Sequence, residues 1–509
     1  MFAKIISVGL FGMEAYMTGV EADISGGMPR FDVVGLPDTA VSESRERVRS
    51  AIKNNGFDFP PSRITINLAP ADIKKEGPIY DLPILIAILK STGQLSCDTD
   101  SSAFLGELSL NGEVRRINGV LPMVIKAQRC GVKEIYIPAP NAAEGAVVRG
   151  ITVYPVRNVG QLLSHLTGGE KITPVSESDF KSYSLPDNLP DFSDVKGQHE
   201  AKRALEVAAA GGHNVMMIGP PGSGKSMLAK RIPSILPDMT FEEMIETTKI
   251  HSIAGLLDKN GLVRTRPFRS PHHTVTAVGL GGGGTGTVRP GEVSLAHNGV
   301  LFLDELPEFS RMSLEVLRQP IEDGKITISR SHGSYTYPCT VMLVAAMNPC
   351  PCGYFNDPSG KCTCTPQKIH NYLNKISGPL LDRFDIHIEV SAVKFDELRD
   401  KEQTEPSAEI KKRVDKARKI QSERYKGTST SCNANINAEQ FEKVCIIDDE
   451  AEQMLKSAFE SMGMTARAYD RVLKVARTIA DLDNSEIIKS DHILEAVQYR
   501  SLDRKYWGK

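Results

Sequence analysis

The stretch that most constrains the fold of this chain is residues 213–232, which joins an apolar run, a glycine-rich loop and a helical pattern. Val215–Ile218 is apolar throughout, as in a strand that is buried on both faces. Gly219–Ser226 then matches G-x-x-x-x-G-K-[ST], and Met227–Ile232 continues as a helix. Because strand and helix stand on the correct sides of the loop, a chance glycine loop is the weaker interpretation, and the stretch predicts a phosphate-binding loop.

The residue types in this loop suit a nucleoside triphosphate with Mg²⁺. Glycines let backbone N–H groups surround the phosphates without a Cβ in the way, and the helix N-terminus adds its partial positive charge. We expect Lys225 to place its ammonium group on the phosphates and the Ser226 hydroxyl to ligate Mg²⁺. The loop residues predicted to bind the nucleotide are Gly219, Pro220, Pro221, Gly222, Ser223, Gly224, Lys225 and Ser226.

A second apolar run, residues 299–303, predicts another buried strand, and two carboxylates follow it, Asp304 and Glu305. Open α/β sheets place ligands at the carboxyl ends of their strands. We therefore predict that Asp304 binds the nucleotide and its Mg²⁺, directly or through water, and that Glu305 polarises the water that attacks the γ-phosphate. Residues 340–347 predict a third strand, and Asn348 at its end either orients that water or simply caps the strand.

Two arginines further along the chain are candidates for catalysis. Arg383 lies in a short polar loop between apolar stretches, and we predict that it reaches the γ-phosphate bound by a neighbouring subunit. Thr465 is a good N-cap for a helix that carries Arg467 and Arg471 one turn apart on the same face. We predict that Arg467 senses the nucleotide of its own subunit. Arg471 is either an ordinary solvated charge or takes that role itself.

Length and composition limit the class of protein. The 509 residues suffice for about three domains, and 40% hydrophobic with 24% charged residues is ordinary for a soluble globular protein. The amino terminus carries no signal-peptide pattern and no apolar run approaches membrane-spanning length, so we expect a cytoplasmic protein without a membrane contact. A net charge of −2 means that any nucleic-acid contact is local.

The order of these patterns divides the chain into four parts. We predict an α/β domain at residues 1–168, a linker at 169–193, a nucleotide-binding α/β core at 194–394 and a helical lid at 395–509. Helical periodicity is found at residues 201–210, 408–425, 451–462, 465–482 and 490–499.

The first domain mixes strand and helix patterns, which predicts an α/β domain with a mixed sheet. Residues 82–89 are nearly all apolar and predict a buried helix. Strands are predicted at residues 63–68, 134–137 and 151–156. Residues 104–115 predict a hairpin in which Asn111 and Gly112 form a type I′ turn.

Parts of this domain resemble the proteolytic domain of Lon proteases. The resemblance is carried by residues 74–78, 105–108, 112–114 and 117–119. That family has a serine after the Gly-Pro pair and a lysine after the later glycine, where this chain has Ile79 and Leu121. Isoleucine cannot act as a nucleophile and leucine cannot deprotonate one. The resemblance therefore implies a Lon-protease-like (ribosomal S5 domain 2-like) fold that is not an active protease and serves as an assembly or regulatory platform.

A wider resemblance is carried by the two nucleotide motifs and by residues 266–274, 280–284, 348–353 and 380–383. With these, nearly the whole chain resembles AAA+ ATPases, and most closely their magnesium-chelatase-like ComM/YifB family. The resemblance implies a P-loop parallel-sheet core with a helical lid, ATP and Mg²⁺ as cofactors, and a homo-oligomeric ring, a hexamer. It also implies a motor of the helicase or branch-migration type acting on single-stranded or branched DNA during natural transformation. A chelatase-type ATPase that remodels proteins or inserts metal is the alternative.

A basic stretch separates the two nucleotide motifs. Residues 259–291 hold five Lys or Arg residues, two histidines and no acid. Within them, residues 279–286 are mostly glycine, so that part of the stretch has almost no side chains. We predict that Arg264, Arg266 and Arg269 bind the phosphates of a DNA strand in the channel of a ring. The alternative is that these arginines face a subunit interface or the nucleotide.

Four of the nine cysteines lie close together in the sequence. Cys350 and Cys352 form one C-x-C pair, and Cys362 and Cys364 form another across a polar loop. Four thiols in one short loop of a cytoplasmic protein suit a structural, tetrahedral Zn²⁺ site. The alternatives are four free thiols or a redox-switchable pair beside Asn348.

Overall fold

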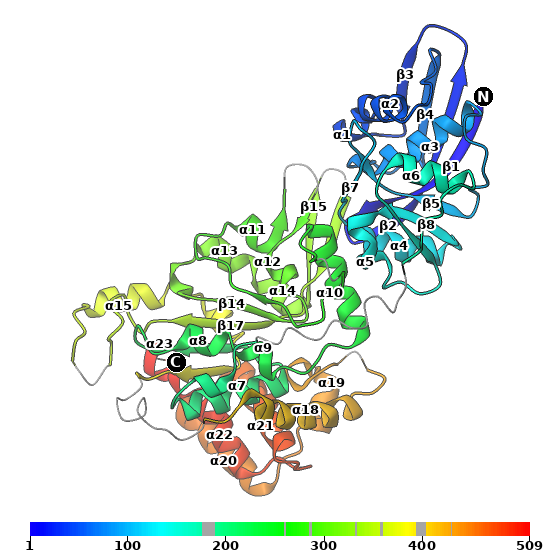
Figure 1. The fold of residues 1–509 in the computed structure, drawn as a ribbon. Helices are drawn as coiled ribbons and strands as arrows, with labels where there is room; N and C mark the ends of the chain where they lie inside the picture. Colours follow the sequence, from blue (N-terminus) through cyan, green and yellow to red (C-terminus); the bar gives the residue numbers. More distant parts are fainter. Residues whose placement is uncertain are drawn as a thin grey trace.

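The computed structural model describes residues 1–175, 189–258, 261–284, 288–330, 333–356, 360–392, 404–428 and 430–508. Figure 1 shows two β-sheets with their helices, one near the amino terminus and one in the middle of the chain, and a group of helices near the carboxyl terminus. The predicted linker and the predicted boundary at residue 394 include residues 176–188 and 393–403, which lie outside the described residues.

The first sheet has seven strands in the order β3-β4-β2-β1-β5-β8-β9. These are β1 (Phe2–Phe11), β2 (Glu14–Ser25), β3 (Arg30–Val34), β4 (Arg63–Ala69), β5 (Ser102–Phe104), β8 (Glu134–Pro138) and β9 (Thr152–Val156). β2 pairs antiparallel with both β4 and β1, while the other neighbouring strands pair parallel, so the predicted mixed sheet is confirmed. Helix α3 (Asp81–Ser91) packs against β1 and β2 and is buried from residue 81 to 89, which confirms the predicted buried helix.

The predicted hairpin at residues 104–115 is only partly right. Phe104 ends β5 in the main sheet, and the hairpin consists of β6 (Glu107–Leu108) and β7 (Val114–Arg115). Between β5 and β6 the chain leaves the direction of β5. There the Leu105 N–H donates to the Tyr136 carbonyl and the Gly106 N–H donates to the Ile79 carbonyl. Asn111 keeps a negative φ and its side chain accepts from the Glu113 N–H, so the connection is a longer loop rather than a type I′ turn.

The second sheet is parallel throughout, with the strand order β11-β14-β17-β10-β18. Its strands are β10 (Val215–Ile218), β11 (Phe268–Arg269), β14 (Val300–Leu303), β17 (Met342–Met347) and β18 (Ile386–Glu389). Alternate residues of β10 enter two different core clusters, Val215 and Met217 on one face, Met216 and Ile218 on the other. This burial on both faces explains the uninterrupted apolar runs and confirms the three strands predicted around the nucleotide motifs.

Helices cover the second sheet. Helix α7 (His199–Gly211) contacts β18 and two later helices, α18 and α21. The later helices are α18 (Ser407–Arg424), α20 (Asp449–Met462), α21 (Ala466–Leu482) and α22 (Ser490–Gln498). Thr465 caps α21 by accepting a hydrogen bond from the Ala468 N–H, as predicted. No helix in the described ranges is both long enough and apolar enough to cross a membrane.

The amino-terminal domain contacts elements of the second domain that lie outside its five-stranded sheet. Phe11, the last residue of β1, packs on Tyr335 of β16 (Gly333–Pro338) with a centroid distance of 4.7 Å, and β16 forms a hairpin with β15 (Lys325–Arg330). In addition, the Gly119 N–H donates to the Ser252 carbonyl of α10 (Phe241–Ala254). In Figure 1, β15 and α10 lie on the side of the second domain that faces the first sheet.

Candidate active site

Three neighbouring strands bring the predicted nucleotide residues together. β17 lies between β10 and β14, and all three run in the same direction. The glycine-rich loop follows β10, Asp304 and Glu305 follow β14, and Asn348 follows β17. The carboxyl ends of parallel strands meet at one edge, so residues far apart in the sequence share one site there.

The loop after β10 adopts a backbone that requires glycine. Gly222 has φ 77° and Gly224 has φ 91°, values that L side chains rarely adopt. At Gly219, a Cβ would lie 2.1 Å from the carbonyl oxygen of Val390. Helix α8 (Lys225–Ala229) begins directly after the loop and directs its free N–H groups toward the same space. The geometry therefore fits a cradle for phosphate groups.

Lys225 is folded into this loop. Its Nζ donates to the carbonyls of Gly219 at 2.7 Å and Pro220 at 2.9 Å, and to Asn348 Oδ1 at 3.2 Å. Burial lowers the pKa of Lys225, and the nearby charge of Asp304 partly offsets this effect. The contact with Asn348 links the end of β17 to the phosphate-binding loop.

The two predicted magnesium ligands touch each other. Ser226 Oγ donates to Asp304 Oδ2 at 2.6 Å. A hydroxyl and a carboxylate, both hard oxygen donors, form the donor set that Mg²⁺ accepts beside a nucleotide, so the residues present fit this ion.

The Glu305 side chain has a neighbour outside this pair. It has φ 53°, in the left-handed region, and its side chain is 57% exposed. Its Oε2 lies 3.2 Å from Nδ1 of His273, a residue from the basic stretch. This histidine is predicted only as part of that stretch, because nothing in its spacing indicates a carboxylate partner.

The arginine predicted to act in a neighbouring subunit is held within its own chain. Arg383 pairs with Glu322, and it donates to the carbonyls of Arg318 at 3.1 Å and Pro379 at 2.6 Å. Its side chain is 15% exposed. A role at another subunit's nucleotide requires these contacts to open.

The two arginines of α21 differ in their surroundings. Arg467, in the first turn, is exposed. Arg471 donates to Asp385 Oδ1 at 2.9 Å, and His213 Nδ1 lies 3.4 Å from the other oxygen of the same carboxylate. Burial opposes ionisation of Asp385, but His213 and Arg471 outweigh it and lower its pKa to about 2. Arg471 is thus not a solvated charge but ties α21 to the residue that precedes β18.

Two of the arginines predicted to bind DNA have carboxylate partners in the chain. Arg266 pairs with Glu243 at 3.1 Å, and Arg269 forms two hydrogen bonds with Glu292, at 2.7 and 2.8 Å. Arg264 is partly buried nearby. The structure does not bring these three side chains to the nucleotide residues, and DNA phosphates would have to replace Glu243 and Glu292.

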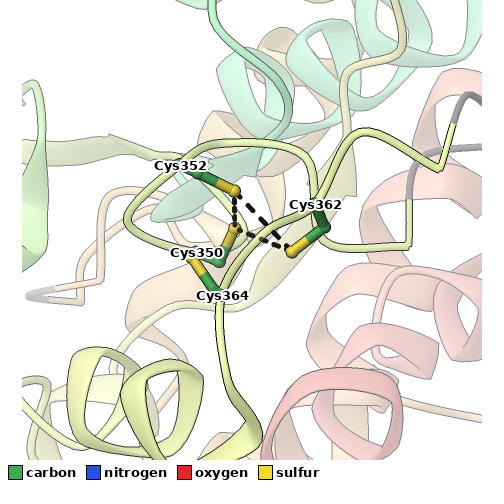
Figure 2. Close-up of side chains that lie close together, drawn as sticks. All are labelled: Cys350, Cys352, Cys362 and Cys364. Atoms are coloured by element: carbon green, nitrogen blue, oxygen red, sulfur yellow. Dashed lines mark hydrogen bonds between the residues drawn. The ribbon is translucent and has the colours of Figure 1, made fainter.

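The four cysteines form one cluster, which Figure 2 shows at close range. The Sγ atoms of Cys350, Cys352, Cys362 and Cys364 all lie within 4.8 Å of one another, and three of the separations are 3.3, 3.7 and 3.8 Å. Tetrahedral Zn²⁺ with Zn–S bonds of about 2.3 Å places its sulfur ligands about 3.8 Å apart. Backbone N–H groups of Tyr354 and Thr363 lower the pKa of Cys352 to about 6, which favours the thiolate. The residues therefore fit a zinc ion.

The cysteine loop also touches the phosphate-binding loop. Cys350 follows Asn348 by two residues, and a Cβ on Gly353 would lie 2.4 Å from Cδ of Pro221. The conformation of the cysteine loop and that of the nucleotide site are therefore linked by direct contact.

Comparison with known proteins covers most of the chain. Family models match residues 20–141 ("Subunit ChlI of Mg-chelatase"), 191–398 ("Magnesium chelatase, subunit ChlI") and 404–500 ("Magnesium chelatase, subunit ChlI C-terminal"). The chain is 42% identical to "Competence protein ComM" of Haemophilus influenzae, over 99% of this chain and 98% of that protein. It is 43% identical to "Uncharacterized protein YifB" of Escherichia coli, over 97% and 96%. It is also 28% identical to "Lon protease 2" of Bacillus subtilis over 151 residues, 28% of this chain and 27% of that protease.

Proposed function

The chain belongs to the magnesium-chelatase-like ComM/YifB family of AAA+ ATPases, and from that premise we propose that it is a ring-forming motor that uses ATP hydrolysis to move on DNA. ATP hydrolysis is supported by one observation above all. At the ends of three adjacent strands, the structure brings together Lys225, Ser226, Asp304 and Asn348. The DNA part is supported by the relation to a protein named for competence and by the basic stretch between the nucleotide motifs. Helicase or branch-migration activity is the form of motor that we propose, in the cytoplasm.

In the proposed reaction each residue at the site has one task. The loop from Gly219 to Gly224 would surround the phosphates with N–H groups, and Lys225 would exchange its carbonyl partners for phosphate oxygens. Ser226 and Asp304 would hold Mg²⁺, which neutralises charge on the phosphates. Glu305 would take up a proton from the attacking water, and Asn348 would orient that water.

The proposal includes a ring, a hexamer, in which each nucleotide lies between two subunits. Arg383 would then leave Glu322 and reach the neighbouring subunit's γ-phosphate, while Arg467 would sense the nucleotide of its own subunit. Arg471 is a poor candidate for either role, because Asp385 already holds it.

We propose that DNA is bound through its phosphates by Arg264, Arg266 and Arg269. The exchange of Glu243 and Glu292 for phosphate groups would make this contact sensitive to salt and insensitive to base sequence. The carboxylates would hold the arginines in place until DNA arrives.

Two further assignments belong to this proposal. Structural Zn²⁺ would occupy the site formed by the four cysteines, since their sulfur atoms have tetrahedral separations. The first domain, residues 1–168, would act as a platform rather than as a protease, because Ile79 and Leu121 are buried apolar side chains at the places of the Lon nucleophile and base.

The alternative is a chelatase-type ATPase that remodels a protein or inserts a metal, which the names of the matching family models favour. Steady-state ATP hydrolysis measured with single-stranded, double-stranded and branched DNA separates the two functions. A DNA motor is expected to hydrolyse ATP faster with at least one of these ligands. Lys225→Ala should lose nucleotide binding and Glu305→Gln should bind ATP without hydrolysing it. If none of the three kinds of DNA changes the rate of ATP hydrolysis, the remodelling ATPase is favoured instead.

A further inference from the structure

Arg383 lies at the edge of the second sheet that is opposite to the nucleotide residues. It stands just before β18, which runs parallel to β10, and the residues that precede these two strands are Asp385 and Asn214. The phosphate-binding loop begins at Gly219, at the other end of β10, so about 16 Å of extended chain separates the two edges. This distance exceeds the length of an arginine side chain, so Arg383 has to serve a nucleotide other than that of its own subunit.

The side chain of Arg383 has to move for this task, whereas its backbone has to stay in place. The guanidinium pairs with Glu322 of α14 (Arg318–Asp323) and has to leave that carboxylate in order to reach a neighbouring subunit. A misplacement of about 1 Å that originates far from the chemistry can cost about a hundredfold in rate. The group that fixes the Arg383 backbone therefore contributes to turnover without touching a phosphate.

Asn214, the residue before β10, holds that backbone. Its Nδ2 donates to the Arg383 carbonyl at 3.0 Å, and its Oδ1 accepts from the Leu343 N–H of β17 at 2.8 Å. Its own carbonyl accepts from the N–H groups of Asp385 and Ile386, at 3.0 and 3.1 Å. Asn214 thus connects three neighbouring strands, β17, β10 and β18, and one of its hydrogen bonds ends on Arg383.

The two side-chain bonds of Asn214 require both a donor and an acceptor. An amide supplies both, a carboxylate only accepts, and an alanine methyl group does neither. In Asn214→Asp an oxygen still accepts from the Leu343 N–H, but the other oxygen faces the Arg383 carbonyl without a proton to donate. This substitution therefore removes the link to Arg383 and keeps the link to β17.

We propose that Asn214 is a positioning residue for hydrolysis in the neighbouring subunit, because it fixes the backbone point from which Arg383 reaches the γ-phosphate there. This inference rests on the proposed function, in which Arg383 acts between subunits. One strand, β10, then carries the phosphate-binding loop of its own subunit at one end and, at the other end, the residue that positions the arginine offered to the next subunit.

The test measures kcat and KM for ATP in full-length Asn214→Asp and Asn214→Ala, together with the melting temperature and the binding of a fluorescent ATP analogue. Asn214→Ala removes the link to Arg383 without adding a charge near Asp385. Asn298→Asp is the matched control. Asn298 lies at the same edge of the sheet, before β14, but its Nδ2 donates to Thr247 of α10 at 3.2 Å.

We expect both Asn214 variants to lower kcat by about tenfold to a hundredfold, since Arg383 is then misplaced. KM and the affinity for the ATP analogue should not change, because the phosphate-binding loop of each subunit stays intact. Asn298→Asp should keep the kcat of the unmodified protein. An unchanged kcat in Asn214→Ala, or an equal loss of kcat in Asn298→Asp, would overturn the proposal.

Two combinations distinguish positioning of Arg383 from a defect in the fold. If Asn214 acts only through Arg383, Asn214→Asp combined with Arg383→Ala should be as slow as Arg383→Ala alone. Asn214→Asp subunits mixed with Lys225→Ala subunits should regain part of the turnover, because the second kind of subunit offers a correctly placed Arg383 to the intact nucleotide sites of the first. Losses that add in the double variant, or a mixture without recovery, would contradict the proposal.

Arg383→Ala alone separates this inference from the proposed function. If Arg383→Ala keeps the kcat of the unmodified protein, the assignment of Arg383 between subunits fails and the role of Asn214 fails with it. If Arg383→Ala is slow while both Asn214 variants turn over ATP at the normal rate, only the inference about Asn214 fails.

Discussion

Ser226 Oγ and Asp304 Oδ2 lie 2.6 Å apart, although 78 positions separate the two residues in the chain. In octahedral coordination with Mg–O distances of about 2.0–2.1 Å, adjacent ligand oxygens are about 2.9 Å apart. The two oxygens therefore need to move only slightly further apart for both of them to bind one ion. The sheet positions this pair, because β10 and β14 fix the points from which the two side chains extend.

Asp304→Asn is expected to abolish magnesium-dependent hydrolysis while leaving metal-free nucleotide binding intact. The amide keeps the size of the side chain but supplies no charge to Mg²⁺, so we expect kcat to fall at least about a hundredfold. Binding of a fluorescent ATP analogue in EDTA and in Mg²⁺ measures the two effects separately. Glu308→Gln is the matched control, because Glu308 lies in the same loop but pairs with Lys375. If Mg²⁺ raises the affinity for the ATP analogue equally in Asp304→Asn and in the unmodified protein, the assignment of Asp304 as a magnesium ligand is contradicted.

Arg383 and Glu322 provide a test of catalysis between subunits. If Arg383 serves the neighbouring nucleotide, Arg383→Ala should keep ATP affinity and lose about a thousandfold in kcat. Glu322→Gln weakens the ion pair that holds Arg383 in its own chain, so turnover should be retained or raised. Subunits with Arg383→Ala mixed with Lys225→Ala subunits should recover part of the activity. If Arg383→Ala and Glu322→Gln lower the melting temperature equally and also lower turnover equally, the ion pair is purely structural.

Asp385 should make stability depend on pH in a defined direction. Its pKa is lowered from 3.8 to about 2 in the folded protein, so its stabilisation is complete above about pH 4 and is lost as the pH falls toward 2. At about 1.4 kcal/mol for each pKa unit, this lowering corresponds to about 2 kcal/mol at neutral pH. Asp385→Asn should lower the free energy of unfolding by about this amount at pH 7, and the difference should shrink below pH 4 in urea titrations.

The same measurement separates the two arginines of α21. Arg471→Ala removes a partner of Asp385 and should destabilise the protein in parallel with Asp385→Asn. Arg467→Ala should leave the free energy of unfolding unchanged and lower ATP turnover, because Arg467 is exposed at the start of the helix. A stable Arg471→Ala variant with impaired turnover would transfer the sensor role to Arg471.

Features that are encoded by residues next to one another in the sequence could be predicted, and contacts between distant segments could not. The phosphate-binding loop, the Asp304 and Glu305 pair and the buried strands were predictable, because phosphate chemistry and burial on both faces restrict the residue types at consecutive positions. The partners of Arg266, Arg269 and Arg383 were not predictable, since each ion pair joins separate segments and any surface acid satisfies the same pattern. For the same reason the contact between His273 and Glu305 left no trace in the spacing.

The arginines of the basic stretch allow DNA binding to be separated from an ordinary ion pair. If Arg269 binds phosphate in exchange for Glu292, Glu292→Gln should increase DNA affinity, since it removes a competing carboxylate. Neutralising Arg264, Arg266 and Arg269 together should weaken binding to single-stranded DNA and reduce the slope of log K against log salt by about 2. Fluorescence anisotropy from low to moderate salt measures both quantities. Unchanged affinity in all of these variants would show that the arginines only stabilise the fold.

The cysteine cluster predicts a metal content and a consequence for the nucleotide site. Elemental analysis of the purified protein should find about one zinc per chain, and Cys362→Ser should lose it, because four thiolates complete the coordination of the ion. Since Gly353 contacts Pro221 and Cys350 follows Asn348 closely, loss of the metal should also weaken ATP binding. Cys130→Ser changes an exposed cysteine outside the cluster and should have neither effect. A metal-free protein whose mass rises by two hydrogens per chain on reduction would instead identify a disulfide, for which Cys350 and Cys352, with sulfur atoms 3.3 Å apart, are the closest pair.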